Sequence, residues 1–296
     1  KLGAVIPSVD IPWSESSAAY ASKLGYKTLR LVGMDGSKPA YYMSKDDVVE
    51  NMFVCSSHDR IMLFSNLGRV YRIKAYEIPE GSRTSKGMNI INMVPLMPEE
   101  KITVIIPVTA TDEEERYICM ITKKGIIKRT RLSDFKNTRK TGIIALALDE
   151  DDELRFVSLT DGTKTLLVAT RDGKAIRFSE SDVRPMGRTA RGVRAIKLGS
   201  GDEVVSMAAC DEDTVVLTVS ETGYGRRSPI SDYRIQTRGG GGTKNYRTER
   251  FGKVTAVVAV DETQDVIMIS SNGIIIRIAV AGISMFARPS KGVRIM

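Results

Sequence analysis

The feature that most constrains this chain is a repeat of about fifty residues. Each copy contains an apolar run, a turn that ends in glycine, and a strand that carries a basic residue, as in residues 166–177. The turn glycines are 57, 48, 50 and 50 residues apart, at Gly68, Gly125, Gly173, Gly223 and Gly273. A period of this length is typical of propellers and other repeat architectures.

A second glycine follows each turn glycine by 17 to 19 residues, in a loop rich in basic and hydroxyl side chains. We call these the loop glycines: Gly87, Gly142, Gly192, Gly242 and Gly292. In the fourth repeat the loop reads Gln236-Thr-Arg-Gly-Gly-Gly-Gly242. Its four glycines therefore occupy a fixed position of the repeat, which argues against a flexible linker between domains.

The local signals predict an all-β fold. Asp172-Gly173 and Asn272-Gly273 are two-residue hairpin signals, and most apolar runs are β-branched and too short for helices. With about four strands per repeat, residues 46–296 are predicted to form a β-pinwheel or propeller-like disc of five to six four-stranded blades. Residues 1–45 do not match the repeat and stay unassigned, either as an eroded first blade or as an unrelated segment.

Composition narrows the function classes. With 296 residues and 42% hydrophobic content the chain can bury a large core, and without a long apolar run or signal peptide it is expected to be cytoplasmic, with no membrane partner. The three cysteines are predicted to be buried thiols, and the only histidine, His58, has no ligand set around it. No metal site is predicted, and no catalytic triad, P-loop or paired carboxylates are present.

The distribution of charge in the sequence predicts that the protein binds a polyanion. The net charge is +8, and basic residues gather in loops separate from the acidic runs, although solvated faces that balance each other remain an alternative. A glycine loop lets main-chain N–H groups approach phosphate, while flanking cations neutralise it. The predicted DNA-binding residues are Arg83, Lys86, Arg139, Lys140, Arg188, Arg191, Arg226, Arg227, Gln236, Arg238, Gly239, Gly240, Gly241, Gly242, Lys244, Arg288 and Lys291.

The sequence resembles a known family. Ser57-His-Asp59, Phe64-Ser-Asn-Leu-Gly-Arg-Val-Tyr-Arg72, Tyr76-Glu-Ile-Pro-Glu80, Val183-Arg-Pro-Met-Gly-Arg188 and Gly223-Tyr-Gly-Arg-Arg227 are similar to the C-terminal domain of the DNA gyrase A subunit, a β-pinwheel. That family carries a Gln-Arg-Arg-Gly-Gly-Lys-Gly box in its first blade. The fourth-repeat loop resembles this box, with Thr237 and Gly241 in place of two basic residues, and residues 1–45 contain no box.

The resemblance implies an accessory domain that wraps duplex DNA and sets the direction of strand passage for negative supercoiling. It implies that DNA cleavage belongs to the gyrase A N-terminal domain and ATP hydrolysis to the gyrase B subunit, so no cofactor is expected in this chain and no catalysis by it alone. ATP and magnesium are expected elsewhere in the holoenzyme. The isolated domain is expected to be monomeric. The alternatives are the related domain of topoisomerase IV and a propeller that binds other proteins.

Overall fold

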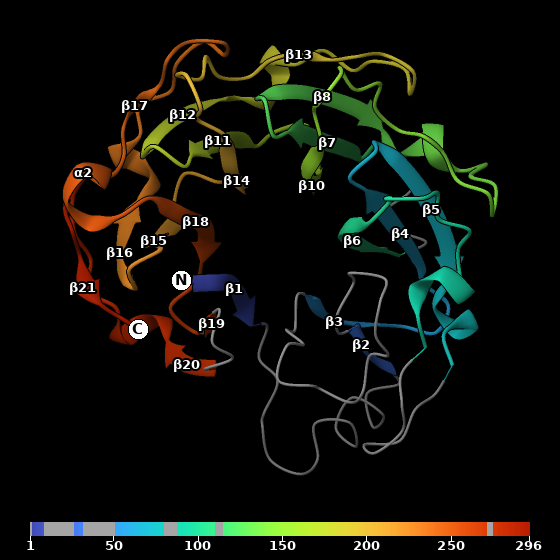
Figure 1. The fold of residues 1–296 in the computed structure, drawn as a ribbon, viewed down its shortest axis with the longest axis horizontal. Coiled ribbons are helices and arrows are strands. Elements are labelled where there is room, and N and C mark those ends of the chain that lie inside the picture. The colour runs from blue at the N-terminus through green and yellow to red at the C-terminus, as the bar shows by residue number, and fades with distance from the viewer. Residues whose placement is uncertain (1, 9–26, 32–50, 80–87, 110–114, 271–274) are drawn as a thin grey trace.

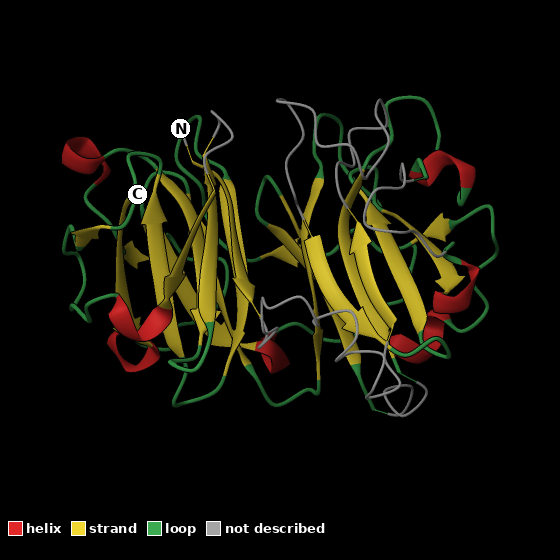
Figure 2. Cartoon of the chain, turned by 90° about the horizontal axis from the view of Figure 1, so that it is seen from below, coloured by secondary structure: helices red, strands yellow, loops and turns green. Residues whose placement is uncertain are grey.

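The structure, a computed structural model, describes residues 2–8, 27–31, 51–79, 88–109, 115–270 and 275–296. Its sheets stand in a ring, each with its inner strand toward the centre (Figure 1). Seen from the side, the strands run between the two faces of a disc (Figure 2). All strand pairs in these sheets are antiparallel, so the predicted all-β disc of blades is confirmed.

Four sheets have four strands and a fifth has three; we number these blades in chain order. From the inner to the outer strand, blade 1 contains β6 (Ile102–Val108), β4 (Arg60–Ser65), β5 (Arg69–Lys74) and β9 (Ile143–Ile144), and blade 2 contains β10 (Leu154–Thr160), β7 (Tyr117–Thr122), β8 (Ile126–Arg131) and β13 (Val193–Arg194). Blade 3 contains β14 (Val204–Cys210), β11 (Thr165–Thr170), β12 (Lys174–Ser179) and β17 (Thr243–Lys244), and blade 4 contains β18 (Val254–Val260), β15 (Val215–Ser220), β16 (Tyr224–Pro229) and β21 (Val293–Arg294). Blade 5 contains β1 (Leu2–Ser8), β19 (Asp265–Ser270) and β20 (Ile275–Ala279).

In the part of the chain that the structure describes, helical structure is confined to single turns between the strands. The 3-10 turns are η1 (Ala75–Glu77), η2 (Ile90–Asn92), η4 (Leu132–Phe135), η5 (Glu180–Asp182), η6 (Ile230–Asp232) and η7 (Val280–Gly282), and the α-helical turn is α2 (Thr248–Phe251). Across the described ranges, no helix combines the length and the apolar character that a bilayer crossing requires.

Neighbouring blades exchange strands. After the third strand of blades 2, 3 and 4, the chain runs back to the preceding blade, supplies its two-residue outer strand, and returns as the inner strand of its own blade. After the third strand of blade 5 it supplies the outer strand of blade 4, and the inner strand of blade 5 is β1. For example, β13 follows β12 of blade 3 in the sequence but pairs with β8 of blade 2. The second to fifth repeats are therefore each divided between two blades, which ties the five blades together in chain order.

Two stretches of the N-terminal segment have described strands. β1 pairs with β19 from Leu2↔Ser270 to Ser8↔Asp265 and takes the inner position of blade 5. β2 (Lys27–Leu31) pairs with β3 (Asn51–Cys55) in a separate ribbon. Residues 9–26 and 32–50 lie outside the described residues, so the assignment of residues 1–45 as a whole stays a prediction.

The core lies between the blades. In β7, Ile118 and Met120 pack toward blade 1, whereas Cys119 and Ile121 pack toward blade 3. Successive side chains of a strand point to opposite faces, so a strand buried on both faces needs a continuous apolar run. Cys119 is one of three free, buried cysteines, which confirms the predicted burial. Burial raises the pKa of its thiol to about 12.

The loop glycines are needed by the strand exchange. Gly142, Gly192, Gly242 and Gly292 all have positive φ, between 68° and 96°. A Cβ on Gly192 would lie 2.6 Å from the carbonyl oxygen of Ile127, and one on Gly242 would lie 2.7 Å from that of Ala175. Only glycine combines this backbone conformation with so close an approach to the third strand of the preceding blade.

Replacing a loop glycine is therefore expected to loosen one blade from the next. Gly192→Ala should lower the free energy of unfolding by about 1–3 kcal/mol, because the added Cβ meets a main-chain oxygen at an unfavourable φ. Gly187→Ala is the matched control, since Gly187 has open space around its Cα and an ordinary φ. Chemical denaturation of the two variants tests this. Equal stability in both would show that the strand exchange does not depend on the glycine.

Candidate nucleic-acid interface

The outer strands place one exposed side chain per blade on the perimeter of the disc. In β9, β13, β17 and β21 the second residue is exposed and the first is half-buried. Figure 1 shows β13, β17 and β21 as the outermost strands. The exposed residues are Arg194, Lys244 and Arg294 in blades 2 to 4, which we call the perimeter row, and Ile144 in blade 1. Three of four outer strands therefore present a cation to solvent.

Further cations lie beside the perimeter row. Lys174 pairs with Lys244 across β12 and β17. Lys197 and Arg247 occupy equivalent exposed positions three residues after Arg194 and Lys244. Of these residues, only Lys244 was among the predicted sites. The signal that finds Arg194, Arg294, Lys197 and Arg247 is the position in the repeat, two or five residues after the loop glycine.

Some predicted loop cations are also exposed. In blade 1, where Ile144 replaces a cation, the loop before β9 carries Arg139 and Lys140, and the Lys140 side chain is 86% exposed. Arg191, 69% exposed, forms an ion pair with Asp149 of the preceding repeat. A hydrogen bond from Arg191 holds the pKa of the Asp149 carboxyl below its usual range. These side chains are accessible to a ligand from solvent.

Two other loop arginines hold the blades together. Arg288 donates from Nη1 to Thr243 Oγ1 (2.7 Å) and the Lys244 carbonyl (3.4 Å), and from Nη2 to the Asp232 carbonyl, while its guanidinium lies 4.5 Å from the Tyr233 ring centre. One repeat earlier, Arg238 makes the same pattern. It donates to the carbonyls of Asp182 (3.0 Å) and Arg194 (3.1 Å). Both guanidinium groups are thus occupied by the preceding repeat.

The prediction that Arg226 and Arg227 bind DNA requires a correction, because both are buried. Arg226 is 0% exposed and donates to the carbonyl of Asn245 (2.6 Å) and to its side-chain oxygen (3.0 Å). Arg227 is 7% exposed and donates to the Ile283 carbonyl (2.5 Å) and to Glu262 (2.6 Å). They fill structural positions of the repeat on the third strand, which is buried on both faces, and their guanidinium groups are taken up by neighbouring residues of the chain.

The same position in blade 2 holds a buried lysine. Lys128 is 0% exposed, and its Nζ donates to the carbonyls of Ala145 (2.7 Å) and Arg188. Burial lowers the pKa of Lys128 from 10.5 to about 8. Arg188, a predicted site residue, therefore helps to hold the blades together through its main-chain carbonyl. Its side chain is half-buried. Arg83 and Lys86 lie outside the described residues.

The four glycines of the fourth repeat have two different roles. Gly239 donates its N–H to the Ala195 carbonyl (2.6 Å), and the Gly240 carbonyl accepts from the N–H of Lys197 (2.8 Å). Gly239 and Gly242 have positive φ, whereas Gly240 and Gly241 do not. A Cβ on Gly241 would meet nothing within 4 Å, and one on Gly240 would meet only ordinary contacts. Gly240 and Gly241 are exposed and could tolerate a side chain.

The remaining predicted residues are half-buried. The Gln236 N–H donates to the Arg177 carbonyl (2.8 Å). The Lys291 Nζ lies 3.8 Å from the ring centre of Tyr224 and 5.2 Å from that of Phe251. A hydrogen bond with Lys291 lowers the pKa of the Tyr224 hydroxyl. This ammonium is accessible at one side and held by aromatic rings at the other.

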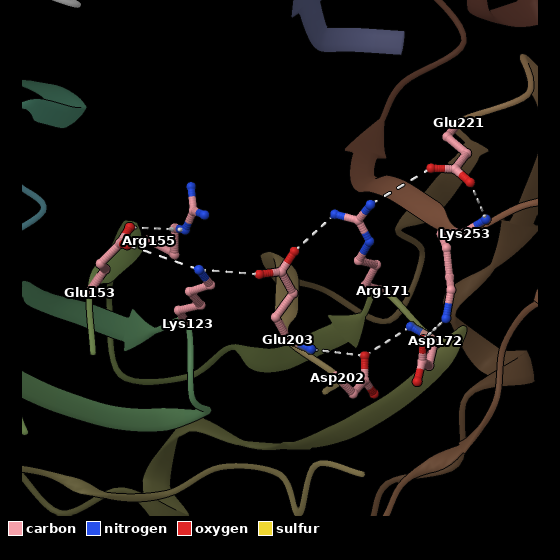
Figure 3. A network of polar contacts seen from close by, with 9 residues as sticks. All are labelled: Lys123, Glu153, Arg155, Arg171, Asp172, Asp202, Glu203, Glu221 and Lys253. Atoms are coloured by element: carbon pink, nitrogen blue, oxygen red, sulfur yellow. Dashed lines mark hydrogen bonds and ion pairs between the residues drawn. The ribbon is translucent and has the colours of Figure 1, made fainter. Parts of the chain in front are cut away.

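Charges near the hairpin turns, by contrast, are paired with one another. Lys123 contacts Glu203 of the next blade (3.6 Å), and Arg171 contacts Glu203 (3.0 Å) and then Glu221 of the blade after it (3.7 Å). Figure 3 shows this network continuing through Lys253. Acidic residues of the repeat are thus used in ion pairs between blades near the hairpin turns. In the perimeter row, Lys244 pairs with the exposed Glu249 (2.8 Å) and Arg294 donates to the Met296 carbonyl (3.1 Å), and all three side chains stay exposed to solvent.

The described ranges contain no group of three His, Cys, Asp or Glu side chains that could hold a metal ion. The groups that the site does offer are cations and main-chain amides on a curved edge. Such a surface can bind phosphate oxygens, and among its exposed side chains no recurring Asn or Gln is placed to read bases.

Comparison with known proteins identifies the family. The family described as "DNA gyrase C-terminal domain, beta-propeller" matches residues 59–109, 116–161, 164–211, 214–261 and 264–296. The chain belongs to this family. The matched segments begin close to the second strand of each blade, so one family repeat begins in each of the five blades.

Relatives and solved structures agree with this assignment. The DNA gyrase A subunit of Clostridium acetobutylicum is 49% identical over 150 residues, which cover 51% of this chain and 18% of the relative. The DNA gyrase A subunit of Staphylococcus epidermidis is 42% identical over 191 residues, which cover 64% of this chain and 21% of the relative. The chain thus spans about a fifth of these relatives. A DNA gyrase A C-terminal domain aligns with a TM-score of 0.74 at 26% identity, over 90% of this chain and 88% of its own. A topoisomerase IV C-terminal domain shares the fold. It aligns with a TM-score of 0.79 at 24% identity, over 92% of this chain and 88% of its own.

The two kinds of arginine are expected to differ in their effect on stability. Arg288→Met should lower the free energy of unfolding by about 1.5–3 kcal/mol, because charge-assisted hydrogen bonds to main-chain carbonyls are lost. Arg194→Met removes an exposed perimeter side chain and should change the free energy of unfolding by less than about 0.5 kcal/mol. Urea unfolding measures both. A larger loss in Arg194→Met than in Arg288→Met would contradict the division between arginines that hold the blades together and arginines of the perimeter row.

Proposed function

We propose that this chain binds and bends duplex DNA along its perimeter, with little dependence on base sequence. The observation that carries the proposal is the perimeter row. A single exposed cation recurs at the same place on the outer strands of blades 2 to 4, and Arg139 and Lys140 stand beside the equivalent strand of blade 1. Cations repeated along a curved edge match the phosphates of a bent duplex.

The energetics suit binding led by the DNA backbone. Neutralising phosphates releases condensed counterions, so affinity depends strongly on salt. Bending 20–30 base pairs by 40–90° costs roughly 1–6 kcal/mol, which contacts on successive blades must offset. Exposed main-chain N–H groups at Gly240 and Gly241 add donors that phosphate can approach closely.

The family gives this binding a place in a larger reaction. We propose that the chain is the accessory domain of a bacterial, cytoplasmic DNA gyrase. There it presents wrapped DNA to the gyrase A cleavage domain so that ATP-driven strand passage, with the gyrase B subunit, introduces negative supercoils. The alternative, the corresponding domain of topoisomerase IV, shares the fold at 24% identity. The relatives at 39–50% identity are gyrase subunits, which favours gyrase.

Reversing charge in the perimeter row should weaken DNA binding and lower its salt dependence. In Arg194→Glu/Lys244→Glu, two phosphate contacts are lost, so the slope of log affinity against log salt should fall in magnitude by about 2. Lys101→Glu/Arg155→Glu is the control, with the same charge change near the hairpin turns. Fluorescence anisotropy with a duplex of about 40 base pairs at several salt concentrations measures both variants.

If the control double variant loses as much affinity as the perimeter variant, DNA binding follows net charge and the perimeter proposal is wrong. If the wild-type chain binds duplex DNA without salt dependence, or does not bind it at low salt, the proposed function itself is wrong.

The exposed glycines are expected to matter for DNA more than for stability. Gly240→Ala/Gly241→Ala should leave the melting temperature nearly unchanged, since both positions have room for a Cβ. It should lower DNA affinity about threefold to tenfold, equivalent to about 0.7–1.4 kcal/mol, because the methyl groups keep phosphate away from the main chain. Gly199→Ala, also in open space, is the control. Unchanged affinity would remove these glycines from the interface.

A further inference from the structure

A second polar site lies between blades 2 and 3. A cavity of about 510 Å³ opens where β7 begins and β8 ends, opposite the Gly125 turn. Its lining includes three arginines, Arg116, Arg129 and Arg131, against two acids, Glu115 and Asp161. Hydroxyl groups of Ser133, Thr163 and Ser181 also line it. The predicted DNA-binding residues are not part of this lining.

Arg129 differs from its counterparts in the following repeats. Arg177 donates to the carbonyls of Ile230 (3.2 Å) and Tyr233 (3.4 Å), and Arg227 donates to those of Ile283 (2.5 Å) and Ala281 (3.5 Å). The Arg129 guanidinium makes no such bond to the next repeat among the described residues. Its Nε is buried without a hydrogen-bond partner, although the residue is only 7% exposed.

The surroundings hold Arg129 toward the cavity. Its guanidinium lies 4.6 Å from the ring centre of Tyr117, which lines the same cavity. Its Nη1 lies 3.6 Å from Glu180, a distance for an ion pair and too long for a hydrogen bond. Glu180 in turn accepts from Thr160 Oγ1 (2.6 Å) and from the Lys164 N–H (2.7 Å). The carboxylate therefore has other hydrogen-bond donors, and the Arg129 side chain forms an ion pair with it but no hydrogen bond among the described residues.

The acids of the lining do not fill the site. Asp161 accepts from the Thr163 N–H (3.0 Å) and hydroxyl (2.7 Å), and Lys164 lies 3.6 Å from it. These bonds keep the pKa of Asp161 below its usual range. Of the two lining acids, Asp161 thus already has donors within its own turn, and three arginines of the lining stand against Glu115. An unsatisfied buried N–H normally costs free energy unless a ligand or water meets it.

We propose that this cavity binds a phosphate group, with the Arg129 Nε–H and the Arg131 guanidinium as donors and the Ser133 and Ser181 hydroxyls beside them. Two guanidinium forks with hydroxyl donors suit a tetrahedral oxyanion with several acceptors. The volume is within the range of small-ligand sites, so the phosphate can carry an organic group. Its source is either a small phosphorylated molecule or the backbone of bound DNA.

A titration without DNA tests the site independently of the proposed function. In the nitrogen–proton correlation spectrum of the chain, the Arg129 Nε–H signal should shift and saturate when inorganic phosphate or pyrophosphate replaces chloride at constant ionic strength. A shift that does not saturate, or that chloride reproduces, would show an adventitious ion only and overturn the proposal.

Variants assign the binding to the cavity. Arg131→Gln/Ser133→Asp changes two exposed lining residues and should lower phosphate affinity about tenfold or more, because one charged donor is lost and a like charge is added. Arg129→Lys keeps a cation beside Glu180 but removes the guanidinium group. Its phosphate affinity, measured by calorimetry, should fall by the same factor. Arg250→Gln, an exposed arginine outside the cavity, is the control. Unchanged affinity in both cavity variants would contradict the site.

Competition then separates the two sources of phosphate. If a 40-base-pair duplex displaces pyrophosphate and shifts the Arg129 signal, the site takes a phosphate of the DNA backbone. If the duplex binds elsewhere and pyrophosphate stays bound, the site takes a small phosphorylated molecule. Both results require saturable phosphate binding at Arg129.

Discussion

The hydrogen bonds that arginines donate to main-chain carbonyls of a neighbouring repeat hold this structure together. On the third strands, Arg177 and Arg227 reach forward to carbonyls that follow the next blade's third strand. In the loops, Arg238 and Arg288 reach backward to the preceding repeat. A carbonyl at an exchanged strand has no regular ladder partner, and a charged donor is stronger than a neutral one. Forward and backward bonds together fix the angle between blades.

This dependence decides which cations are available for a ligand. A guanidinium that already donates to two carbonyls would have to break those bonds to reach a phosphate. The exposed residues of the two-residue outer strands bind only close to themselves in the chain, since Lys244 pairs with Glu249 and Arg294 donates to the Met296 carbonyl. The acids are similarly divided, because Glu203 and Glu221 pair with cations of neighbouring blades near the hairpin turns. The perimeter keeps an excess of positive charge although the chain as a whole is only moderately basic.

The sequence was sufficient for the fold class but not for the roles of the basic residues. Turn glycines, short β-branched runs and the fifty-residue period led to blades, because these signals are local and repeat. The strand exchange could not be predicted, since nothing local shows that Val193 and Arg194 pair with the preceding blade. For the same reason Arg226 and Arg227 were expected at the surface. Side chains next to each other in sequence point to opposite faces of a strand, and here both faces are buried.

The most direct test of this account is a structure of the chain bound to a duplex of about 40 base pairs. We expect phosphates within hydrogen-bond distance of Arg194, Lys244 and Arg294, while Arg238 and Arg288 keep their carbonyl partners in the preceding repeat. Phosphates bound instead by Arg238 and Arg288, with those carbonyl bonds broken, would contradict it. So would a duplex that lies across a face of the disc and leaves the perimeter row uncovered.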